Sequence, residues 1–368
     1  MLKVFCSPSR YTQGKDATAA LGQEMTTLGL TGPALIVAGR NAIRLLADTW
    51  TRSLGEANIR HAVHEFGGEC SLAEVERIKA AARRDGARVM IGAGGGKVLD
   101  AARAAAADLD LAVVSCPTVA STDAPTSALS VIYTAEGAFQ EYRFYRKNPD
   151  LVLVDTQVIA SSPPRLFVAG MGDAMSTYFE ARTSVAAHKK NMRGGASTLS
   201  ALALAELCYR TVLADGEQAL AAVKSQVVTP ALERVVEANT LLSGLGFESS
   251  GLAAAHAIHN GLTAAHATHD YLHGEKVAFG VVVQLVLEGA PRNTIDEVLA
   301  FFVAVGLPIT LADIGLADVS SETLAQIADR ATAPGETIHN EPFAITADMV
   351  RDAILAADAL GRAWKHDG

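Results

Sequence analysis

The sequence predicts an α/β amino-terminal domain with a parallel sheet, followed by an all-helical carboxyl-terminal domain. In the first half, short apolar runs alternate with amphipathic helical segments. After "SSPPR" at 161–165, runs typical of strands nearly vanish, and alanine and leucine recur with a helical period. A chain of 368 residues is long enough for two domains that each bury a core. We therefore expect the domains to span residues 1–162 and 163–368.

Four apolar runs are the expected strands of the first domain, at residues 34–38, 88–94, 111–117 and 151–155. Segment 71–86 lies between two of them, and its apolar residues recur every three or four positions, as in an amphipathic helix. This βαβ rhythm predicts a Rossmann-like parallel sheet with helices on its faces. Two β-rich runs around residues 135–137 interrupt the rhythm and predict an inserted hairpin.

Composition argues against several classes of partner and site. Acidic residues outnumber basic ones by 40 to 31, for a net charge of −9, which disfavours binding to nucleic acid. No segment approaches the roughly 20 apolar residues that span a membrane, and the amino terminus has no pattern of a secretion signal. The four cysteines form no CxxC pair, so we expect free thiols in a cytoplasmic protein.

A glycine-rich loop follows the expected strand at 88–94 and precedes a helical segment. Its residues are Gly92, Gly94, Gly95, Gly96 and Lys97. Backbone N–H groups of such a loop can approach a phosphate, and the positive end of the following helix favours that charge. The string is neither GxGxxG nor a P-loop, and the alternative is a turn that only packs helix against strand.

The next expected strand leads into a loop rich in serine and threonine that contains Asp123. Its side chains would lie at the carboxyl ends of the strands, where open α/β sheets bind ligands. The alternative interpretation is a loop whose hydroxyl groups bond only to its own backbone.

Five of the ten histidines lie between residues 252 and 276. His256 and His259 are three residues apart, and His269 and His273 are four apart, so each pair can share a helix face. The dipeptide at 260–261 predicts a break between two helices, and Gly274 predicts a helix end after His273. Two helices can thus each direct one imidazole to a common point.

Asp173, in the apolar stretch "AGMGDAMSTYFEA", is the natural third ligand beside two histidines. Two imidazoles and one carboxylate leave an open position on Zn²⁺ for a substrate, the pattern of catalytic zinc sites. Taken singly, each histidine is more often a surface or satisfied core residue, and Asp173 after Gly172 can also cap a helix.

The ordered set of motifs closely resembles the glycerol dehydrogenases, the metal-dependent polyol branch of the iron-type alcohol dehydrogenase superfamily. The motifs span nearly the whole chain: "GECS" (68–71), "GAGGGKVLD" (92–100), "STDAPTSALSVIY" (121–133), "GMGDAM" (170–175), "GLAAAHAIHNGLT" (251–263), "HGEKVAFG" (273–280) and "GETIHN" (335–340). The resemblance implies the two-domain architecture of dehydroquinate synthase and iron-type alcohol dehydrogenases, and a homo-oligomer.

The resemblance also implies a role for individual residues. Zn²⁺ is held by Asp173, His256 and His273; Thr177 stands where iron-binding relatives have a further histidine, which favours zinc, and His269 is expected beside the ligands or in the pocket. Asp123 is expected to reach the substrate hydroxyls. The residues expected at NAD are Gly94, Gly95, Gly96, Lys97, Thr118, Ser121, Ser127, Leu129 and Tyr133.

Two positions depart from the pattern of the family. Gly39 and Arg40 stand where an acidic residue often binds the adenosine ribose, and an arginine there can accommodate a 2′-phosphate, so NADP competes with NAD as the expected cofactor. Glu341 stands where we expect a neutral residue.

The function expected from this resemblance is oxidation of glycerol or a similar vicinal diol to dihydroxyacetone, with Zn²⁺ activating the hydroxyl and hydride passing to NAD. Alternatives are another polyol dehydrogenase or a phospho-substrate relative such as a glycerol-1-phosphate dehydrogenase. The latter sites need several lysines and arginines, and the pocket motifs offer mainly Lys276. A noncatalytic protein that binds NAD and metal is the third alternative.

Overall fold

The computed structural model describes residues 1–135, 137 and 139–367, which pack as two compact units. The α/β unit consists of Cys6–Pro163 and Ala222–Gly244, and the helical unit of Met1–Phe5, Pro164–Ala221 and Leu245–Gly368. The chain passes between the units next to the expected division at 162/163. Two segments, Met1–Phe5 and Ala222–Gly244, pack with the unit opposite to the one expected from that division.

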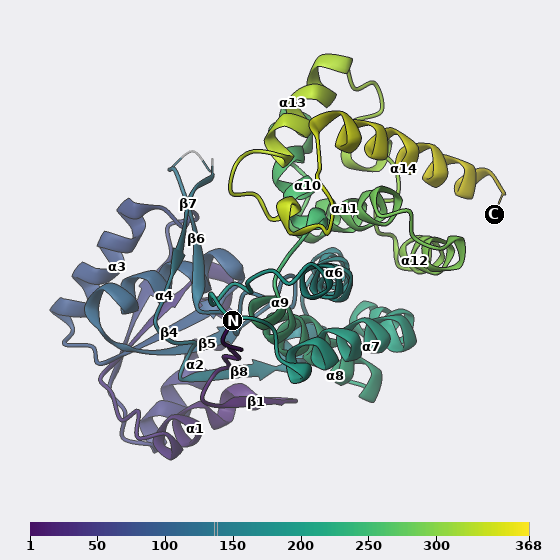
Figure 1. Ribbon diagram of the computed structural model, residues 1–368. Coiled ribbons are helices and arrows are strands. Elements are labelled where there is room, and N and C mark those ends of the chain that lie inside the picture. Colours follow the sequence, from purple (N-terminus) through teal and green to yellow (C-terminus); the bar gives the residue numbers. More distant parts are fainter. Residues whose placement is uncertain (136, 138, 368) are drawn as a thin grey trace. The chain divides into compact units, whose positions relative to one another are not determined.

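The α/β unit is built on a six-stranded sheet in which every neighbouring pair is parallel (Figure 1). The strand order is β1-β8-β5-β4-β2-β3, with bounds β1 Tyr11–Gly14, β2 Ala34–Ala38, β3 His61–Glu65, β4 Val89–Gly94, β5 Ala112–Pro117 and β8 Leu151–Asp155. Strands β2, β4, β5 and β8 confirm the four predicted runs. The two strands that the sequence pattern did not predict, β1 and β3, form the edges of the sheet.

Successive residues of the central strands enter different cores, as the pleat of a strand requires. Ile36 and Ala38 pack in a cluster with residues of α1 (Leu21–Thr27) and α2 (Arg40–Glu56). Leu35 and Val37 pack instead with residues of α3 (Leu72–Arg84) and α4 (Gly96–Leu109). Helices therefore cover both faces of the sheet, which confirms the predicted α/β layering.

The sheet reverses its winding between β2 and β4. From β2 the chain continues outward to β3, whereas from β4 it continues in the other direction to β5 and then β8. In an open parallel sheet the crevice at such a reversal, outside the carboxyl ends of the strands, is where ligands bind. A hairpin of β6 (Leu129–Tyr133) and β7 (Phe139–Phe144) precedes β8, as predicted, and α5 (Thr156–Ala160) follows it.

Hydrogen bonds explain why residues 222–244 pack with the α/β unit. This segment contains α8 (Pro230–Glu237) and a π-helical turn, Ala238–Leu242. The Asn239 amide donates to the carbonyl oxygen of Ala120 at 3.1 Å, and Thr126 Oγ1 donates to the carbonyl oxygen of Thr240 at 3.3 Å. Its polar groups thus bond to the serine- and threonine-rich loop after β5.

The named elements in the described residues from Pro164 onward are all helices, as predicted, including those in Ala222–Gly244. Its principal helices are α6 Pro164–Ala186, α7 Leu199–Lys224, α9 Ser243–Ser250, α10 Ala254–Leu262, α11 His273–Leu287, α12 Arg292–Val305, α13 Ser321–Ala331 and α14 Ala347–Asp367. Among the described helices, none combines the length and the apolar character needed to cross a membrane.

Candidate functional site

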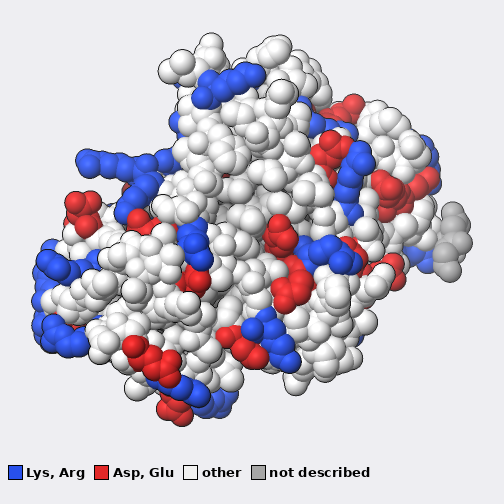
Figure 2. Space-filling view, turned by 90° about the horizontal axis from the view of Figure 1, so that it is seen from below, with Lys and Arg blue, Asp and Glu red and all other residues white. Residues whose placement is uncertain are grey.

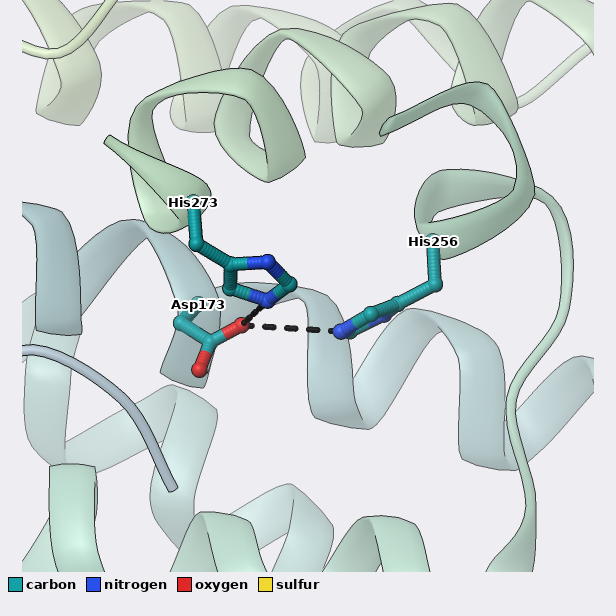
Figure 3. Close-up of side chains that lie close together, drawn as sticks. All are labelled: Asp173, His256 and His273. Carbon is teal, nitrogen blue, oxygen red and sulfur yellow. Dashed lines mark hydrogen bonds and ion pairs between the residues drawn. The ribbon is translucent and has the colours of Figure 1, made fainter. Parts of the chain in front are cut away.

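Three side chains from three helices of the helical unit point toward one another (Figure 3): Asp173 of α6, His256 of α10 and His273 of α11. Asp173 Oδ1 lies 3.1 Å from His273 Nε2 and 3.6 Å from His256 Nε2. Asp173 is almost completely buried, and both histidines are partly buried. The structure therefore brings together the three residues that the sequence analysis selected as ligands.

Close helix packing brings Asp173 and His273 together. A Cβ atom on Gly274 of α11 would lie 1.8 Å from the carbonyl oxygen of Ala169 of α6, and one on Gly172 would lie 2.5 Å from the carbonyl oxygen of Gly274. Only glycine permits such backbone contact. The glycines next to the aspartate and next to the histidine thus set the distance between their helices.

Two helix boundaries differ from the prediction. Helix α10 continues through Asn260 and Gly261 to Leu262, because Gly261 packs against the backbone of α13: a Cβ there would lie 2.5 Å from the carbonyl oxygen of Ile327. His273 begins α11, so Gly274 does not end a helix. His269 consequently does not share a helix face with His273; it is exposed, and its Nε2 contacts the carbonyl oxygen of Thr263 at 3.0 Å.

Glu180, which the sequence analysis did not select, fixes the orientation of His256. It lies on α6, two turns after Asp173, and is completely buried. Its Oε2 lies 2.5 Å from His256 Nδ1, and its Oε1 accepts from the backbone N–H groups of Ala253 and His256 at 2.9 and 3.0 Å. A proton on Nδ1, shared with this carboxylate, leaves Nε2 to face Asp173.

His259 stands beside His273 in the place expected for His269. His273 Nδ1 lies 3.0 Å from His259 Nε2, and His259 Nδ1 lies 3.1 Å from Asn260 Oδ1. The Asn260 amide donates in turn to Glu336 Oε2 at 2.9 Å. If His273 Nε2 binds a metal, its Nδ1 carries the proton. Each donor group in this series of hydrogen bonds, from His273 through His259 and Asn260 to Glu336, then has an acceptor.

The charges of the cluster are strongly coupled. Burial alone raises the pKa of Asp173, but His273 and His256 outweigh it and hold that pKa below its usual value. Burial lowers the pKa of His256, and Glu180 and Asp173 more than compensate, so that it lies well above its usual value. Burial, together with His273 and Lys276, lowers the pKa of His259. Two carboxylates thus face His256, whereas His259 lies near His273 and Lys276.

The donor atoms fit a small divalent cation. Two ligands that bind a tetrahedral zinc ion at roughly 2.1 Å lie about 3.4 Å apart, close to the 3.1 and 3.6 Å separations around Asp173 Oδ1. All three ligand atoms lie within 4.8 Å of one another. One carboxylate and two imidazoles also suit zinc or iron chemically.

In the α/β unit, the glycines of the loop differ in how tightly they are packed. Gly94 ends β4 and packs tightly, since a Cβ there would lie 2.6 Å from Val98. Gly95 and Gly96, the N-cap and first residue of α4, are different: an added Cβ would meet only ordinary contacts at 3.4 and 3.5 Å. Packing therefore explains Gly94, whereas the open backbone at Gly95 and Gly96 fits a phosphate at a helix amino terminus.

The other expected cofactor residues surround the same end of the sheet. Lys97 is exposed, donates to Glu69 Oε2 at 2.6 Å and lies 5.2 Å from the centre of the Tyr133 ring. Leu129 and Tyr133 belong to β6, and the Thr118 N–H donates to the carbonyl oxygen of Gly94. Ser121 and Ser127 flank Asp123 in the loop after β5, and Ser127 Oγ donates to the carbonyl oxygen of Ala124.

Asp123 lies in this loop, where its Oδ2 accepts from Ser243 Oγ at 3.0 Å. It is half-buried and belongs to the α/β unit, whereas Asp173, His256 and His273 belong to the helical unit. Each unit therefore carries its own set of predicted functional residues.

Positive charge is sparse near the three-residue cluster. Lys276 is buried, donates to the carbonyl oxygen of Thr268, and has its pKa lowered by that burial. Arg165 is engaged by both oxygens of Glu275, at 2.6 and 2.8 Å. On the face that Figure 2 shows, lysine and arginine side chains are interspersed with aspartate and glutamate, so no field of one sign extends across it.

Glu341 is a buried carboxyl group in the helical unit. It is 3 % exposed, and among the described residues no positively charged side chain forms an ion pair with it; a weak contact with the backbone N–H of Ala254 opposes the effect of its burial. Burial is the largest cause that raises its pKa, and together with the neighbouring carboxylates of Glu288 and Glu180 it raises that pKa to about 8. With this pKa the carboxyl group is mainly protonated at neutral pH.

We expect Glu341→Gln to change the pH dependence of stability. The folded chain retains a proton that the unfolded chain releases above its ordinary pKa of 4.5, so the wild type loses stability as the pH rises from about 4.5 to about 8. The variant lacks this loss. Near pH 8 its free energy of unfolding should therefore exceed that of the wild type by about 2 to 4 kcal/mol. Urea unfolding across this range measures it, with exposed Glu217→Gln as control; parallel wild-type and Glu341→Gln curves would contradict the assignment.

Comparison with known proteins identifies similar chains along the whole length. The model of the iron-containing alcohol dehydrogenase family matches residues 8–156. A glycerol dehydrogenase of Citrobacter freundii is 50% identical over 364 residues, 99% of each chain. A glycolaldehyde reductase of Halobacterium salinarum is 48% identical and covers 98% of this chain and 99% of its own. The crystal structure of a probable glycerol dehydrogenase from Sinorhizobium meliloti 1021 has a TM-score of 0.91 at 41% identity, with 98% and 99% of the two chains covered.

Proposed function

Because the chain belongs to the glycerol dehydrogenases of the iron-containing alcohol dehydrogenase family, we propose that it oxidises glycerol to dihydroxyacetone with NAD and a bound Zn²⁺. One observation carries this proposal: Asp173, His256 and His273 direct three ligand atoms to one point. They do so in a chain whose sequence is about 50% identical to glycerol dehydrogenases. A four-coordinate zinc ion with three protein ligands keeps its fourth coordination position for a substrate oxygen.

Zinc is the finer part of the metal proposal, since the name of the family refers to iron. Thr177 supports zinc: it lies one turn after Asp173 on α6 and is buried, and its hydroxyl is a much weaker metal ligand than the histidine of iron-binding relatives. Among the described residues the cluster has three members. Three protein ligands and one open position are the arrangement of catalytic zinc.

The chain's own residues supply position and charge. When bound, zinc supplies Lewis acidity that lowers the pKa of a substrate hydroxyl, and NAD accepts the hydride. Asp173 contributes a fixed negative charge, Glu180 orients His256, and His259 orients His273. We assign Asp123 to orienting the glycerol hydroxyls, with Ser243 holding its carboxylate. In the cofactor loop, the N–H groups at Gly95 and Gly96, together with Lys97, bind the pyrophosphate.

A substrate panel tests the proposal. NADH formation from glycerol and NAD, followed by absorbance, should exceed that from glycerol 1-phosphate by at least about a hundredfold, because a phosphate site needs several cationic side chains. Lys276 is buried and donates to a backbone carbonyl oxygen, and Arg165 is paired with Glu275. Reduction of glycolaldehyde by NADH is assayed in parallel, given the glycolaldehyde reductase among the relatives. Turnover of the phosphate ester but not of glycerol would replace the proposed substrate; binding of NAD and metal without any turnover would support a noncatalytic protein.

We expect Glu180→Gln to weaken metal binding by about 10- to 100-fold, because a neutral amide no longer holds the proton of His256 Nδ1 as a carboxylate does. Titration of the metal-free chain with Zn²⁺ measures the dissociation constant directly. Glu217→Gln, which removes an exposed carboxylate, is the matched control. A Glu180→Gln chain with wild-type zinc affinity would show that this carboxylate only supports the fold.

The remaining parts of the proposal concern location and assembly. Use of NAD, and four cysteines that form no disulfide in the described structure, support a cytoplasmic location. The resemblance to the family supports a homo-oligomer, whose size light scattering on the purified chain would measure.

A further inference from the structure

An exposed ion pair lies next to the reversal of the sheet, where Gly39 and Arg40 rather than an acidic residue follow β2. Arg40 is the first residue of α2, and its Nε and one terminal nitrogen donate to Glu65 Oε1 at 3.1 and 2.9 Å. Glu65 is the last residue of β3 and pairs in register with Ala38, the last residue of β2. The Phe66 N–H also donates to the carbonyl oxygen of Ala38, which holds Glu65 beside Gly39.

The Arg40–Glu65 pair lies on one side of the cofactor loop. Gly39 follows Ala38, which pairs with Ala93 of β4, so β2 ends directly beside Gly94 and Gly95. Strands in a sheet are about 4.8 Å apart, which places the end of β3 about 10 Å from the pyrophosphate position at the end of β4. The loop that contains Asp123 lies on the other side, after β5. If Asp123 faces the substrate, the nicotinamide half of the cofactor lies over β5, and the adenosine half lies over β2 and β3.

We propose that Glu65 and Arg40 together select NAD over NADP at the adenosine ribose. The Glu65 carboxylate takes the place of the acidic residue that is absent at Gly39 and accepts a hydrogen bond from the ribose 2′-hydroxyl. It also engages Arg40, which would otherwise pair with a 2′-phosphate, and it repels that phosphate directly. This inference rests on the proposed use of a nicotinamide dinucleotide.

The exposure of the pair makes it suitable for this task. The side chains of Arg40 and Glu65 are 86% and 51% exposed, so their ion pair contributes little to folding and is open to a ligand. Substitutions at either position should therefore leave the fold intact. A second ion pair, Arg84 with Asp85, lies at the carboxyl end of α3, which precedes the start of β4 and so lies at the opposite end of the sheet from the cofactor loop; it provides a control of equal charge.

The test compares the dissociation constants of NADH and NADPH, measured by fluorescence titration of the purified chain without substrate. For the wild type we expect tighter binding of NADH. Glu65→Gln should lower the ratio of the NADPH constant to the NADH constant by at least about tenfold, because it frees Arg40 and removes the repulsion. Adding Arg40→Ala to Glu65→Gln should reverse most of the gain for NADPH. Asp85→Asn, which changes the net charge equally, should leave the ratio within about twofold.

Each result separates the inference from the proposed function. A wild type that binds neither dinucleotide contradicts the proposed function itself. A wild type that prefers NADPH overturns the role of Glu65 and replaces NAD by NADP in the proposed reaction, while glycerol oxidation itself stands. A Glu65→Gln chain with an unchanged ratio overturns the role of Glu65 alone. A gain for NADPH that survives Arg40→Ala would overturn the role of Arg40.

Discussion

Asp173→Asn should abolish zinc binding and glycerol oxidation together. The substitution keeps the size of the side chain but removes the negative charge between His256 and His273, whose Nε2 atoms lie 3.6 and 3.1 Å from its Oδ1. Loss of Lewis acidity should reduce turnover by at least about a thousandfold. Zinc content after dialysis, together with NADH formation, measures both effects in the same preparation.

A matched variant distinguishes loss of the ligand from loss of the fold. His269→Ala removes an exposed imidazole of the same histidine-rich stretch whose ring contacts Thr263 rather than Asp173. We expect it to retain stoichiometric zinc and to keep turnover within about threefold of the wild type, since it leaves the ligands in place. Full activity in Asp173→Asn, or loss of zinc in His269→Ala with zinc retained by Asp173→Asn, would contradict the assignment of the ligands.

Gly274→Ala should destabilise the helical unit by at least about 3 kcal/mol. The added methyl group would lie 1.8 Å from the carbonyl oxygen of Ala169, a backbone atom that cannot rotate away, so α6 and α11 must separate. Because Asp173 and His273 lie on these two helices, metal affinity should fall as well. Thermal unfolding and zinc titration of the variant measure the two losses.

Gly55→Ala is the control for this prediction. Gly55 lies near the end of α2, and an added Cβ there would meet nothing within 4 Å. Alanine favours helix over glycine, so we expect unchanged or slightly higher stability. A Gly274→Ala chain with wild-type melting temperature and zinc affinity would show that the spacing of α6 and α11 does not depend on this glycine.

The sequence predicts the sheet where its strands are buried on both faces. The runs that form β2, β4, β5 and β8 are continuously or almost continuously apolar, as central parallel strands are. The edge strands β1, "YTQG", and β3, "HAVHE", have a neighbouring strand on one side only and contain more polar residues. A search for apolar runs therefore does not detect them. Tertiary hydrogen bonds, such as that from Asn239 to Ala120, assign residues 222–244 to the α/β unit, and no periodicity encodes these.

The sequence also predicts which residues meet in the helical unit but not how they are held. Asp173, His256 and His273 are ligand types in an apolar setting, so composition and resemblance were enough to select them. Glu180 was missed, although its position seven residues after Asp173 places both carboxylates on one face of α6. His259 was noted only for its spacing; its contact with His273 depends on where α11 begins, and that boundary was predicted wrongly.

Removal and return of the metal in the unmodified chain tests the central claim most directly. The purified protein is dialysed against a chelator, freed of it, and assayed for NADH formation from glycerol and NAD before and after one equivalent of Zn²⁺, with Fe²⁺ in parallel. We predict that activity disappears with the metal, returns with zinc at one ion per chain, and does not return in Asp173→Asn. Undiminished glycerol oxidation by the metal-free chain would contradict it.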